Sequence, residues 1–244
     1  MPPVKTLDAA QVEAMAISLE SRSAREVLAW GVQEFSPRIG LASSFGAEDV
    51  VLIDLLVAIT PPVTVFTLDT GRLNEETYEV MEQIRQKYGI SIMSYFPGRE
   101  RVQQLEREKG FYSFRRSVEN RKECCGIRKV EPLARALDGL DAWITGLRRE
   151  QAVTRTGVPK VERDAAHQGM VKLNPLADWS EQQVWDYIRA HDVPYNALHD
   201  RHYPSIGCAP CTRAVKPGED VRAGRWWWET PEQKECGLHV KPAA

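Results

Sequence analysis

The stretch "IGLASSFGAEDVVLIDLLVAI" (residues 39–59) contains the pattern that decides the fold. Residues 39–45 form a short apolar segment ending in small side chains, which predicts a strand. Residues 47–59 are mostly apolar and predict a largely buried helix. The segment "VTVFTLD" (63–69) that follows is rich in β-branched residues, which indicates a second strand.

The same alternation continues outward from this stretch and predicts an α/β fold. Strands that alternate with helices of this length favour a doubly wound, mostly parallel sheet covered on both faces. Ligands of such sheets bind beyond the carboxyl ends of the strands. The further predicted elements are helices over 7–36, 74–89 and 180–191, another helix after Cys125, and strands over 90–96 and 141–148.

The chain divides by composition into three predicted parts. Residues 1–36 form an N-terminal helical segment, and residues 37–200 form the α/β nucleotide-binding domain. Residues 201–244 are rich in Gly, Pro, Arg and Trp and show little periodicity. This last part is expected to be a loop-rich C-terminal segment folded over the strand ends.

Composition narrows the classes of function. The 244 residues are 43% hydrophobic and 27% charged, with a net charge of −2. This balance suits one large globular domain and gives no case for binding nucleic acid or a membrane surface. No apolar run approaches the roughly 20 residues of a membrane span, and no signal-peptide pattern opens the chain. A cytoplasmic location is expected, where cysteines serve metals or catalysis more often than disulfides.

Two strand-end loops favour a nucleotide site. "SSFGAED" (43–49) places hydroxyls and a glycine before a helix N-terminus, where backbone N–H groups can hold an anion. "LDTGRL" (68–73) adds a turn glycine and Arg72. Each loop alone is equally compatible with an ordinary turn, the first with a serine cap. No Walker or Gly-x-Gly-x-x-Gly motif is present.

Four of the five cysteines can be grouped into one site. Cys124 and Cys125 are adjacent, and Cys208 and Cys211 form a Cys-x-x-Cys. Four thiolates suit zinc or an iron–sulfur cluster. Adjacent cysteines fit awkwardly around one tetrahedral ion and more easily at separate corners of a cluster, which favours the cluster. The alternative is that the adjacent pair are buried small hydrophobes, against which their charged flanks argue.

The fifth cysteine, Cys236, is not needed for the site of four thiolates and lies in "KECGLH" near the C-terminus. It is either an unremarkable thiol or a nucleophile on a segment that must meet two partners in turn. Lys234, His239 and Lys241 are the local cations that would lower its pKa.

Further basic residues can form a cationic pocket at the strand ends. The guanidinium group of arginine suits phosphate and sulfate oxyanions. For Arg222 and Arg225 the alternative to an anion site is a solvated arginine pair beside packed tryptophans. The residues concerned are Arg128, Lys129, Arg148, Arg149, Arg222 and Arg225.

Taken together these motifs resemble a known family. "SSFGAED", "LDTGRL", "CCGIRKVEPL" (124–133), "TGLRREQ" (145–151), "CAPCTRAV" (208–215), "GRWWWE" (224–229) and "KECGLH" (234–239) are similar to the assimilatory adenylyl-sulfate reductases. Those enzymes are the iron–sulfur branch of the phosphoadenylyl-sulfate reductase family. The resemblance spans about residues 35–240.

The resemblance implies a fold of the adenine-nucleotide α-hydrolase type and a thioredoxin-dependent reduction of adenylyl sulfate to sulfite and AMP. Cys236 would attack the sulfur and become an S-sulfocysteine, and thioredoxin or a glutaredoxin-like dithiol protein would release sulfite. A homo-oligomer is also implied. The matched residues are Cys124, Cys125, Cys208 and Cys211 for a [4Fe–4S] cluster; Ser43, Ser44, Phe45, Gly46, Leu68, Asp69, Thr70, Gly71 and Arg72 for the nucleotide; and Lys129, Arg148, Arg222, Arg225 and His239 near the phosphosulfate.

Three alternatives stay open beside this interpretation. A phosphoadenylyl-sulfate reductase, or a dual-substrate enzyme, would use the same chemistry with an extra cationic contact. An ATP-using enzyme of the same fold would need glycines where Ser44 and Phe45 stand. A zinc module without enzymatic activity is disfavoured by the low basicity and by the spare Cys236.

Overall fold

The computed structural model describes residues 7–59, 61–152, 155–230, 234 and 237–238. These residues form a six-stranded sheet in the order β3-β2-β1-β4-β6-β5. All neighbouring strands are parallel except β5, which pairs antiparallel with β6 at one edge. The strands are β1 (Ile39–Ala42), β2 (Thr64–Leu68), β3 (Ile92–Tyr95), β4 (Ala142–Ile144), β5 (Val161–Asp164) and β6 (Met170–Leu173).

The strand order creates a crevice between β1 and β4. The chain runs from β1 outward to β2 and β3, then returns to the other side of β1 through β4. The connections that leave β1 and β4 therefore diverge to opposite sides, which opens a binding crevice at the carboxyl ends of these two strands.

The sheet is buried on both faces, as expected of parallel strands. Val65 of β2 faces the larger of two apolar cores, whereas the next residue, Phe66, faces the other. The same alternation holds for Ile144 and Trp143 of β4. This period of two forces the chain to supply helices for each face.

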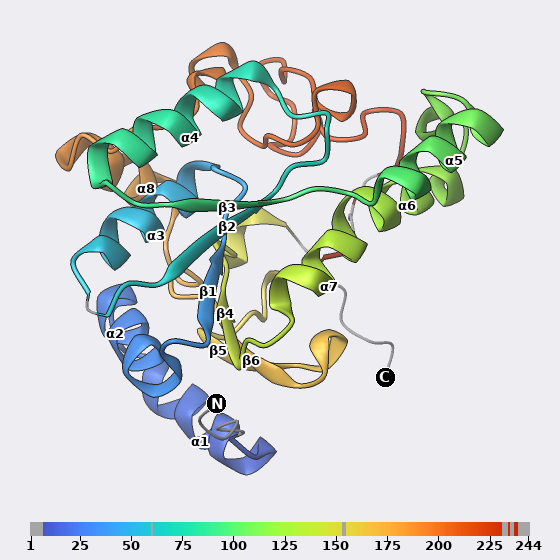
Figure 1. The fold of residues 1–244 in the computed structure, drawn as a ribbon. Helices are drawn as coiled ribbons and strands as arrows, with labels where there is room; N and C mark the ends of the chain where they lie inside the picture. Colours follow the sequence, from blue (N-terminus) through green and yellow to red (C-terminus); the bar gives the residue numbers. More distant parts are fainter. Residues whose placement is uncertain (1–6, 60, 153–154, 231–233, 235–236, 239–244) are drawn as a thin grey trace.

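Helices cover the sheet unequally, as Figure 1 shows. One face carries α2 (Ala24–Phe35), α3 (Ala47–Val57), α4 (Glu75–Tyr88) and α8 (Glu181–Ala190), and α1 (Ala9–Leu19) packs against β5. The other face is covered by α7 (Glu131–Leu137), whose Leu133 packs against Phe66 and Trp143.

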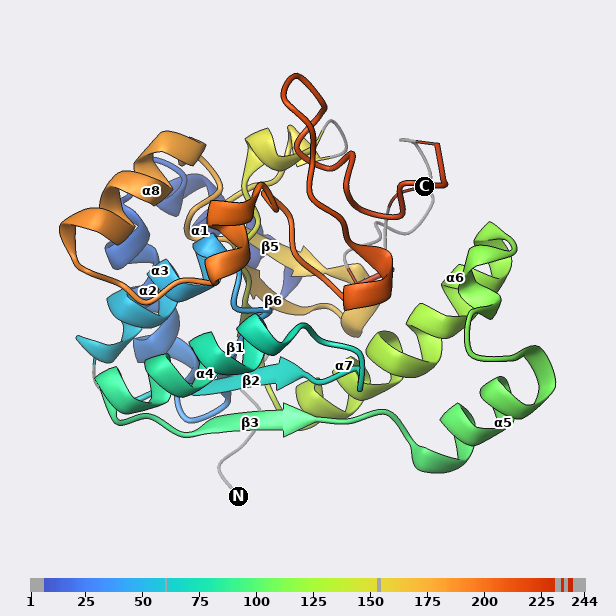
Figure 2. The ribbon, with the colours of Figure 1, turned by 90° about the horizontal axis from the view of Figure 1, so that it is seen from above.

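A helical projection extends beyond α7 in both views (Figure 1, Figure 2). It comprises α5 (Arg99–Lys109) and α6 (Val118–Cys125). A π-helical turn over Gly126–Val130 joins α6 to α7. Such turns interrupt helices mostly at functional sites, and this one lies directly after Cys124 and Cys125.

The segment that follows α8 crosses the strand ends and reaches the projection. Ala209 N donates to Arg72 O, 2.8 Å away, which fixes the Cys-x-x-Cys beside the loop after β2. Trp226 N donates to Cys211 O at 3.1 Å, which ties the tryptophans to the same motif. These backbone bonds replace regular secondary structure in holding the loop-rich part in place.

Most predicted elements are confirmed, and several details differ. The helical segment 7–36 is two helices, because the Ser23 side chain accepts from Glu26 N and caps a new start. Gly89 ends α4 in the left-handed conformation, and Ser180 forms a capping box with Gln183 at the start of α8. The strands over 39–45 and 141–148 are shorter than predicted. Elements α5, α6, β5 and β6 were not predicted, since their sequences lack a clear apolar period.

The division into three parts stays a prediction. Among the described residues, no helix is long and apolar enough to cross a membrane.

Gly224 provides a test of how the C-terminal segment is held. A Cβ at this position would lie 2.2 Å from the backbone oxygen of Arg213, and Arg213 N donates to Gly224 O. Gly224→Ala should therefore lower the free energy of unfolding by about 1–3 kcal/mol, because backbone cannot move aside cheaply. Urea unfolding of Gly157→Ala is the control, since nothing lies within 4 Å of a Cβ there. Equal stability of the two variants would contradict this account.

Candidate active site

A cavity of about 320 Å³ lies at the crevice between β1 and β4. This volume is at the lower end of the range for small-molecule sites. Its walls are the loops after β1, β2 and β4 together with the C-terminal segment. The sequence-predicted residues that line it are Ser43, Ser44, Gly46, Leu68, Lys129, Arg148, Arg222 and Arg225.

The loop after β1 is held open by a buried carboxylate. Ser44 donates to Asp49 Oδ2 through both its backbone N (2.6 Å) and its Oγ (2.8 Å). Ser43 Oγ accepts from Phe45 N, and Phe45 has a φ of 58°, in the left-handed region. Gly46 begins α3 without a side-chain cap, so the serine cap considered from the sequence is not formed. Both serines instead serve the loop itself.

Asp49 also fits closely against the loop after β4. A Cβ on Gly146 would lie 2.4 Å from Asp49 Oδ1. Burial raises the pKa of Asp49 to about 6, against the hydrogen bonds from Ser44, which lower it. The carboxylate therefore joins two strand-end loops at a cost in solvation.

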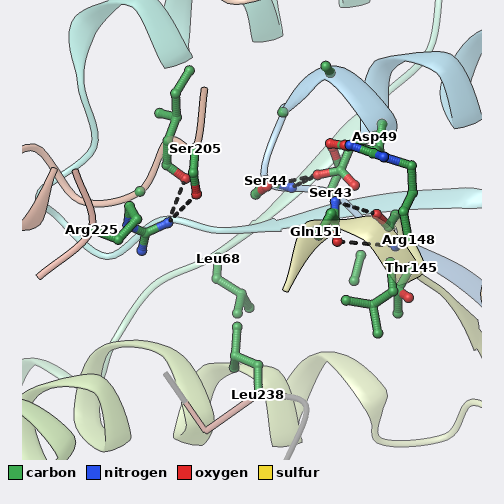
Figure 3. Close-up of a pocket in the computed structure, with 18 of the residues that line it drawn as sticks. Ser43, Ser44, Asp49, Leu68, Thr145, Arg148, Gln151, Ser205, Arg225 and Leu238 are labelled. Carbon is green, nitrogen blue, oxygen red and sulfur yellow. Dashed lines mark hydrogen bonds and ion pairs between the residues drawn. The ribbon is translucent and has the colours of Figure 1, made fainter. Parts of the chain in front are cut away.

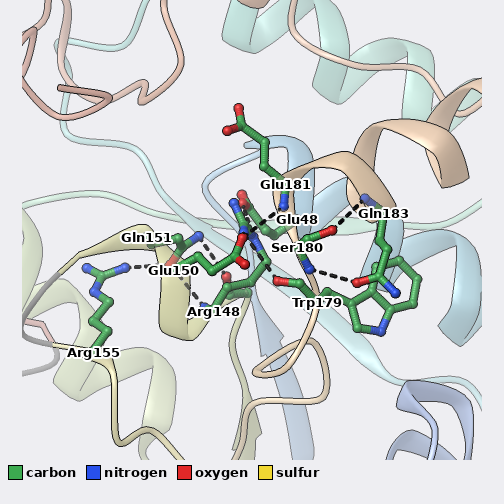
Figure 4. A network of polar contacts seen from close by, with 10 residues as sticks. Glu48, Arg148, Glu150, Gln151, Arg155, Trp179, Ser180, Glu181 and Gln183 are labelled. Carbon is green, nitrogen blue, oxygen red and sulfur yellow. Dashed lines mark hydrogen bonds and ion pairs between the residues drawn. The ribbon is translucent and has the colours of Figure 1, made fainter. Parts of the chain in front are cut away.

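The loop after β4 is an ion-paired network (Figure 4). Arg148 Nε donates to Glu48 Oε1 at 2.8 Å, and its NH1 donates to Trp179 O. Gln151 Oε1 accepts from Arg148 N, and Glu150 lies 3.5 Å from the guanidinium. The sequence placed Arg148 beside a phosphosulfate, but its charge is already balanced by Glu48.

Arg225 stands on the opposite wall from Arg148 (Figure 3). Its NH1 donates to Ser205 Oγ at 3.4 Å and Ile206 O at 3.1 Å. Arg222 NH2 donates to Lys234 O at 2.7 Å. Leu68 and Leu238 lie between the two walls in this view. The cavity thus has one wall of Ser44, Asp49 and Arg148 and another wall that includes Arg225.

The loop after β2 borders both cavities. Asp69 accepts from Gly71 N (2.8 Å) and from the hydroxyl of Tyr78. Thr70 Oγ1 lies 3.2 Å from Cys208 Sγ, and Arg72 donates to Glu106 Oε1. Arg72 lines the cavity of the cysteines. The assignment of this loop to the nucleotide remains a prediction, apart from Leu68, which lines the large cavity.

The four cysteines predicted to work together do lie together. Cys124, Cys125, Cys208 and Cys211 are free thiols that line one small cavity of about 20 Å³. Three of them are buried and Cys208 is half-buried. Two come from the end of α6 and two from a 3₁₀ turn more than 80 residues later.

Basic side chains surround these thiols. Burial raises the pKa of the Cys124 thiol, and the charges of Arg72 and Arg128 oppose that effect. Burial, then the neighbouring cysteines, raise the pKa of Cys211 to about 12. The thiols therefore bear negative charge together only where added positive charge offsets it. The cations lining the pocket are Arg72, Arg121, Arg128, Lys129 and Arg225.

The polar groups around the pocket are compatible with the predicted iron–sulfur cluster. No group of three or more His, Cys, Asp and Glu side chains in the described ranges is placed to hold one metal ion. Two buried groups that line the pocket, Arg128 Nε and Trp226 Nε1, have no hydrogen-bond partner. Such N–H donors suit the sulfur atoms of an anionic cluster, whose own charge the surrounding arginines would balance.

A buried ion pair fixes the C-terminal segment to the cysteine helix. Arg121 NH2 and Glu229 Oε2 are 2.8 Å apart, and their side chains are 0% and 2% exposed. Arg121 also stacks over Trp226, with its Cζ 4.8 Å from the ring centroid. Neither residue was singled out from the sequence as part of a site.

Lys129 lines both the large cavity and the cysteine pocket, as do Arg225 and Trp226. This placement supports the expectation that Lys129 lies between cluster and substrate. Cys236 and His239 lie outside the described residues. Their described neighbours reach the same area, because Leu238 lines the large cavity and a Cβ on Gly237 would lie 3.8 Å from Val130.

Sequence reasoning missed three site residues that the structure reveals. Asp49 and Glu48 sit inside the quoted loop "SSFGAED", and their acidity beside an expected anion site was the available signal. Ser205 carried no signal, because only the fold brings it to Arg225.

Known proteins similar to this chain were found by sequence. Residues 38–214 match the family described as "Phosphoadenosine phosphosulfate reductase domain". The adenosine 5'-phosphosulfate reductase of Allochromatium vinosum is 52% identical over 232 residues, covering 95% of this chain and 87% of the relative.

Solved structures agree as well. The phosphoadenylyl-sulfate reductase of Candida auris, a phosphate complex, superposes with a TM-score of 0.74 at 30% identity, over 87% of this chain and 100% of that one. The FMN adenylyltransferase of Candida glabrata gives 0.56 at 15% identity, over 94% of this chain and 78% of that one. The latter likeness shows the fold alone and agrees with the expected adenine-nucleotide α-hydrolase type.

Asp49→Asn tests the buried carboxylate. The pKa of Asp49 is about 6 in the folded chain, above the ordinary value of 3.8. Between pH 3.8 and pH 6, the folded chain therefore keeps a proton on Asp49 that the unfolded chain has lost. The contribution of Asp49 to stability is therefore greatest below about pH 4 and is lost as pH rises through 6, by up to about 3 kcal/mol. The asparagine variant should lack this loss and exceed the parent in stability at pH 7.5. Urea unfolding from pH 4 to 7.5 measures this, with exposed Asp138→Asn as control, and identical pH profiles for Asp49→Asn and the parent would refute it.

Glu229→Ala tests the buried pair. Removing the carboxylate leaves the Arg121 guanidinium fully buried beside the thiols, which should cost about 3–5 kcal/mol. Glu219→Ala is the matched control, since it removes a partner of Arg213 from the same segment, where both side chains are about one-third exposed. Its loss of stability should be much smaller than that of Glu229→Ala, because solvent screens the pair. Thermal unfolding of both variants measures these losses of stability. A similar loss in the two variants would contradict the role assigned to the buried pair of Arg121 and Glu229.

Proposed function

Because this chain belongs to the phosphoadenosine phosphosulfate reductase family, we propose that it is an oxidoreductase that reduces adenosine 5'-phosphosulfate to sulfite and AMP. One observation carries the proposal beyond the family. The cavity at the strand ends and the pocket of four cysteines share the walls formed by Lys129, Arg225 and Trp226. A nucleotide cavity alone would suit many enzymes of this fold. A nucleotide cavity that shares a wall with a pocket of four cysteines is specific to the proposed reaction.

The substrate's two halves suit the two walls of the cavity. Ser43, Ser44 and Gly46 supply backbone and hydroxyl groups at the crevice, and Leu68 offers an apolar surface to the nucleoside. The phosphosulfate belongs at the side of Lys129, Arg222 and Arg225. Cations there stabilise the charge that develops on the leaving phosphate in the transition state.

The chemistry needs a nucleophile that enters and leaves the site. The thiolate of Cys236 attacks the sulfur, an S–S bond forms, the S–O bond to the phosphate breaks, and AMP leaves with the electron pair. His239 lies three residues further on in the sequence and would assist at the same phosphosulfate. A dithiol protein, thioredoxin or one like glutaredoxin, then attacks the S-sulfocysteine and releases sulfite.

Cys124, Cys125, Cys208 and Cys211 would hold a [4Fe–4S] cluster. When bound, the cluster supplies an electrostatic and structural centre next to the substrate, since the thiols provide the electrons of the reaction. The residues of this chain that act towards it are the cations around the pocket, and Lys129 would serve both cluster and phosphosulfate. A homo-oligomer, a cytoplasmic location and a part in sulfate assimilation complete the proposal.

The 3'-phosphorylated nucleotide is the second candidate substrate. It is favoured by the structural likeness to the phosphoadenylyl-sulfate reductase of Candida auris. Against it, Glu48 and Asp49 line the wall that holds Arg148, and an added phosphate there would meet carboxylates. We therefore place adenosine 5'-phosphosulfate first.

Cys236→Ser, purified without oxygen, tests the mechanism. Sulfite release from adenosine 5'-phosphosulfate should fall by at least about a thousandfold, because the nucleophile is lost. Iron content and the brown colour should stay at the parent's values, since the cysteine is not a ligand. Cys124→Ser is the matched control, in which iron should be lost. The same assay with the 3'-phosphorylated nucleotide ranks the two substrates.

Retained sulfite production by Cys236→Ser would remove the covalent mechanism. A colourless parent protein that holds zinc would remove the cluster.

A further inference from the structure

The helical projection formed by α5 and α6 carries an unusual surface. Residues 99–123 contain eight Lys and Arg against five Glu, a net charge of +3 in a chain whose total is −2. One of these cations, Arg121, is buried and paired with Glu229. The projection therefore concentrates positive charge that the rest of the molecule lacks. Both ribbon views show it extending away from the sheet (Figure 1, Figure 2).

Large aromatic side chains are exposed on the same surface. Phe111 is 67% exposed, Tyr112 is 62% exposed and Trp227 is 39% exposed. They stand beside Arg115, whose Cζ lies 5.2 Å from the Tyr112 centroid and 5.5 Å from the Trp227 centroid. We call Phe111, Tyr112, Arg115 and Trp227 the basic-aromatic patch. Aromatic and arginine side chains together are the commonest energetic centres of protein interfaces.

The patch adjoins the proposed catalytic machinery. Arg115 NH2 donates to Pro210 O, 3.1 Å away, within the Cys-x-x-Cys. Trp227 lies nine residues before Cys236 in the sequence, a length of chain that spans at most about 32 Å. A protein held at the patch is therefore within reach of the proposed nucleophile.

We propose that the basic-aromatic patch is the docking surface for the dithiol protein that releases sulfite, and that this partner presents an acidic face to it. The proposal rests on the proposed function. Charge complementarity selects the partner, since an acidic protein is attracted to the exposed cations of the projection, such as Arg115, Arg116 and Lys122, and repelled by the chain outside residues 99–123, which carries −5.

Docking places the partner's thiol at the covalent intermediate. The partner's thiolate attacks the sulfur of the Cys236 S-sulfocysteine, an S–S bond forms between the proteins, and sulfite leaves with the electron pair of the broken bond. The partner's second thiolate then attacks the mixed disulfide and returns the Cys236 thiolate. The partner ends as a disulfide, so electrons and atoms balance.

Two reductants separate docking from chemistry. Dithiothreitol, a small dithiol, needs no docking surface, whereas reduced thioredoxin does. Phe111→Ser and Arg116→Glu alter exposed side chains on the projection. In each variant we expect kcat/KM for thioredoxin to fall at least tenfold, while the rate with dithiothreitol stays within twofold of the parent. Added salt should lower the thioredoxin rate of the parent more than that of Arg116→Glu.

Matched controls lie on other faces of the molecule. Ile17→Ser changes an exposed apolar residue of α1 and Arg189→Glu reverses an exposed charge of α8. Neither should alter either rate by more than twofold.

Three outcomes would overturn the proposal. An unchanged kcat/KM for thioredoxin shows that docking occurs elsewhere. An equal fall with dithiothreitol shows that the patch supports the active site itself. A change of molecular mass on light scattering, without a selective loss of the thioredoxin rate, shows an interface between copies of this chain. If the parent forms no sulfite with either reductant, the proposed function itself fails, and the docking variants play no part in that result.

Discussion

The active site depends on burying four thiols and several guanidinium groups in one apolar pocket. The guanidinium groups can be buried there because carboxylates pair with them, since an unpaired buried charge would be costly. Arg121 is balanced by Glu229, and Arg128 by Glu106 at 2.7 Å. The same contacts hold the projection and the C-terminal segment against each other, so the pocket organises the part of the molecule that has least regular structure.

The cysteine pocket also determines one wall of the large cavity. Lys129 lies on the π-helical turn immediately after Cys124 and Cys125, and the backbone of Arg225 pairs with that of Thr212, next to Cys211. Disturbing the thiols therefore moves the side chains that face the substrate. The two cavities are therefore coupled through shared walls.

The two sides of the cavity are built on different principles. Around the loops after β1 and β4, Arg148 is neutralised by Glu48, and Asp49 holds Ser44 at a cost in solvation. On the other side, Arg225 donates to neutral oxygens of Ser205 and Ile206. The first wall is rigid because each polar group has a partner within it, and the second is formed by a segment that reaches the site only through tertiary contacts.

The sequence by itself determined the α/β class, the central strands and the grouping of the cysteines, because apolar period and residue spacing are local properties. It could not show β5 and β6, nor the break at Ser23, since short edge strands and caps leave weak patterns. It also could not show that the Arg72 side chain contacts Glu106 and lines the cysteine pocket. Only the tertiary structure decided that Lys129 and Arg225 are shared between two cavities, because side-chain direction depends on how distant segments pack and not on the order of residues along the chain.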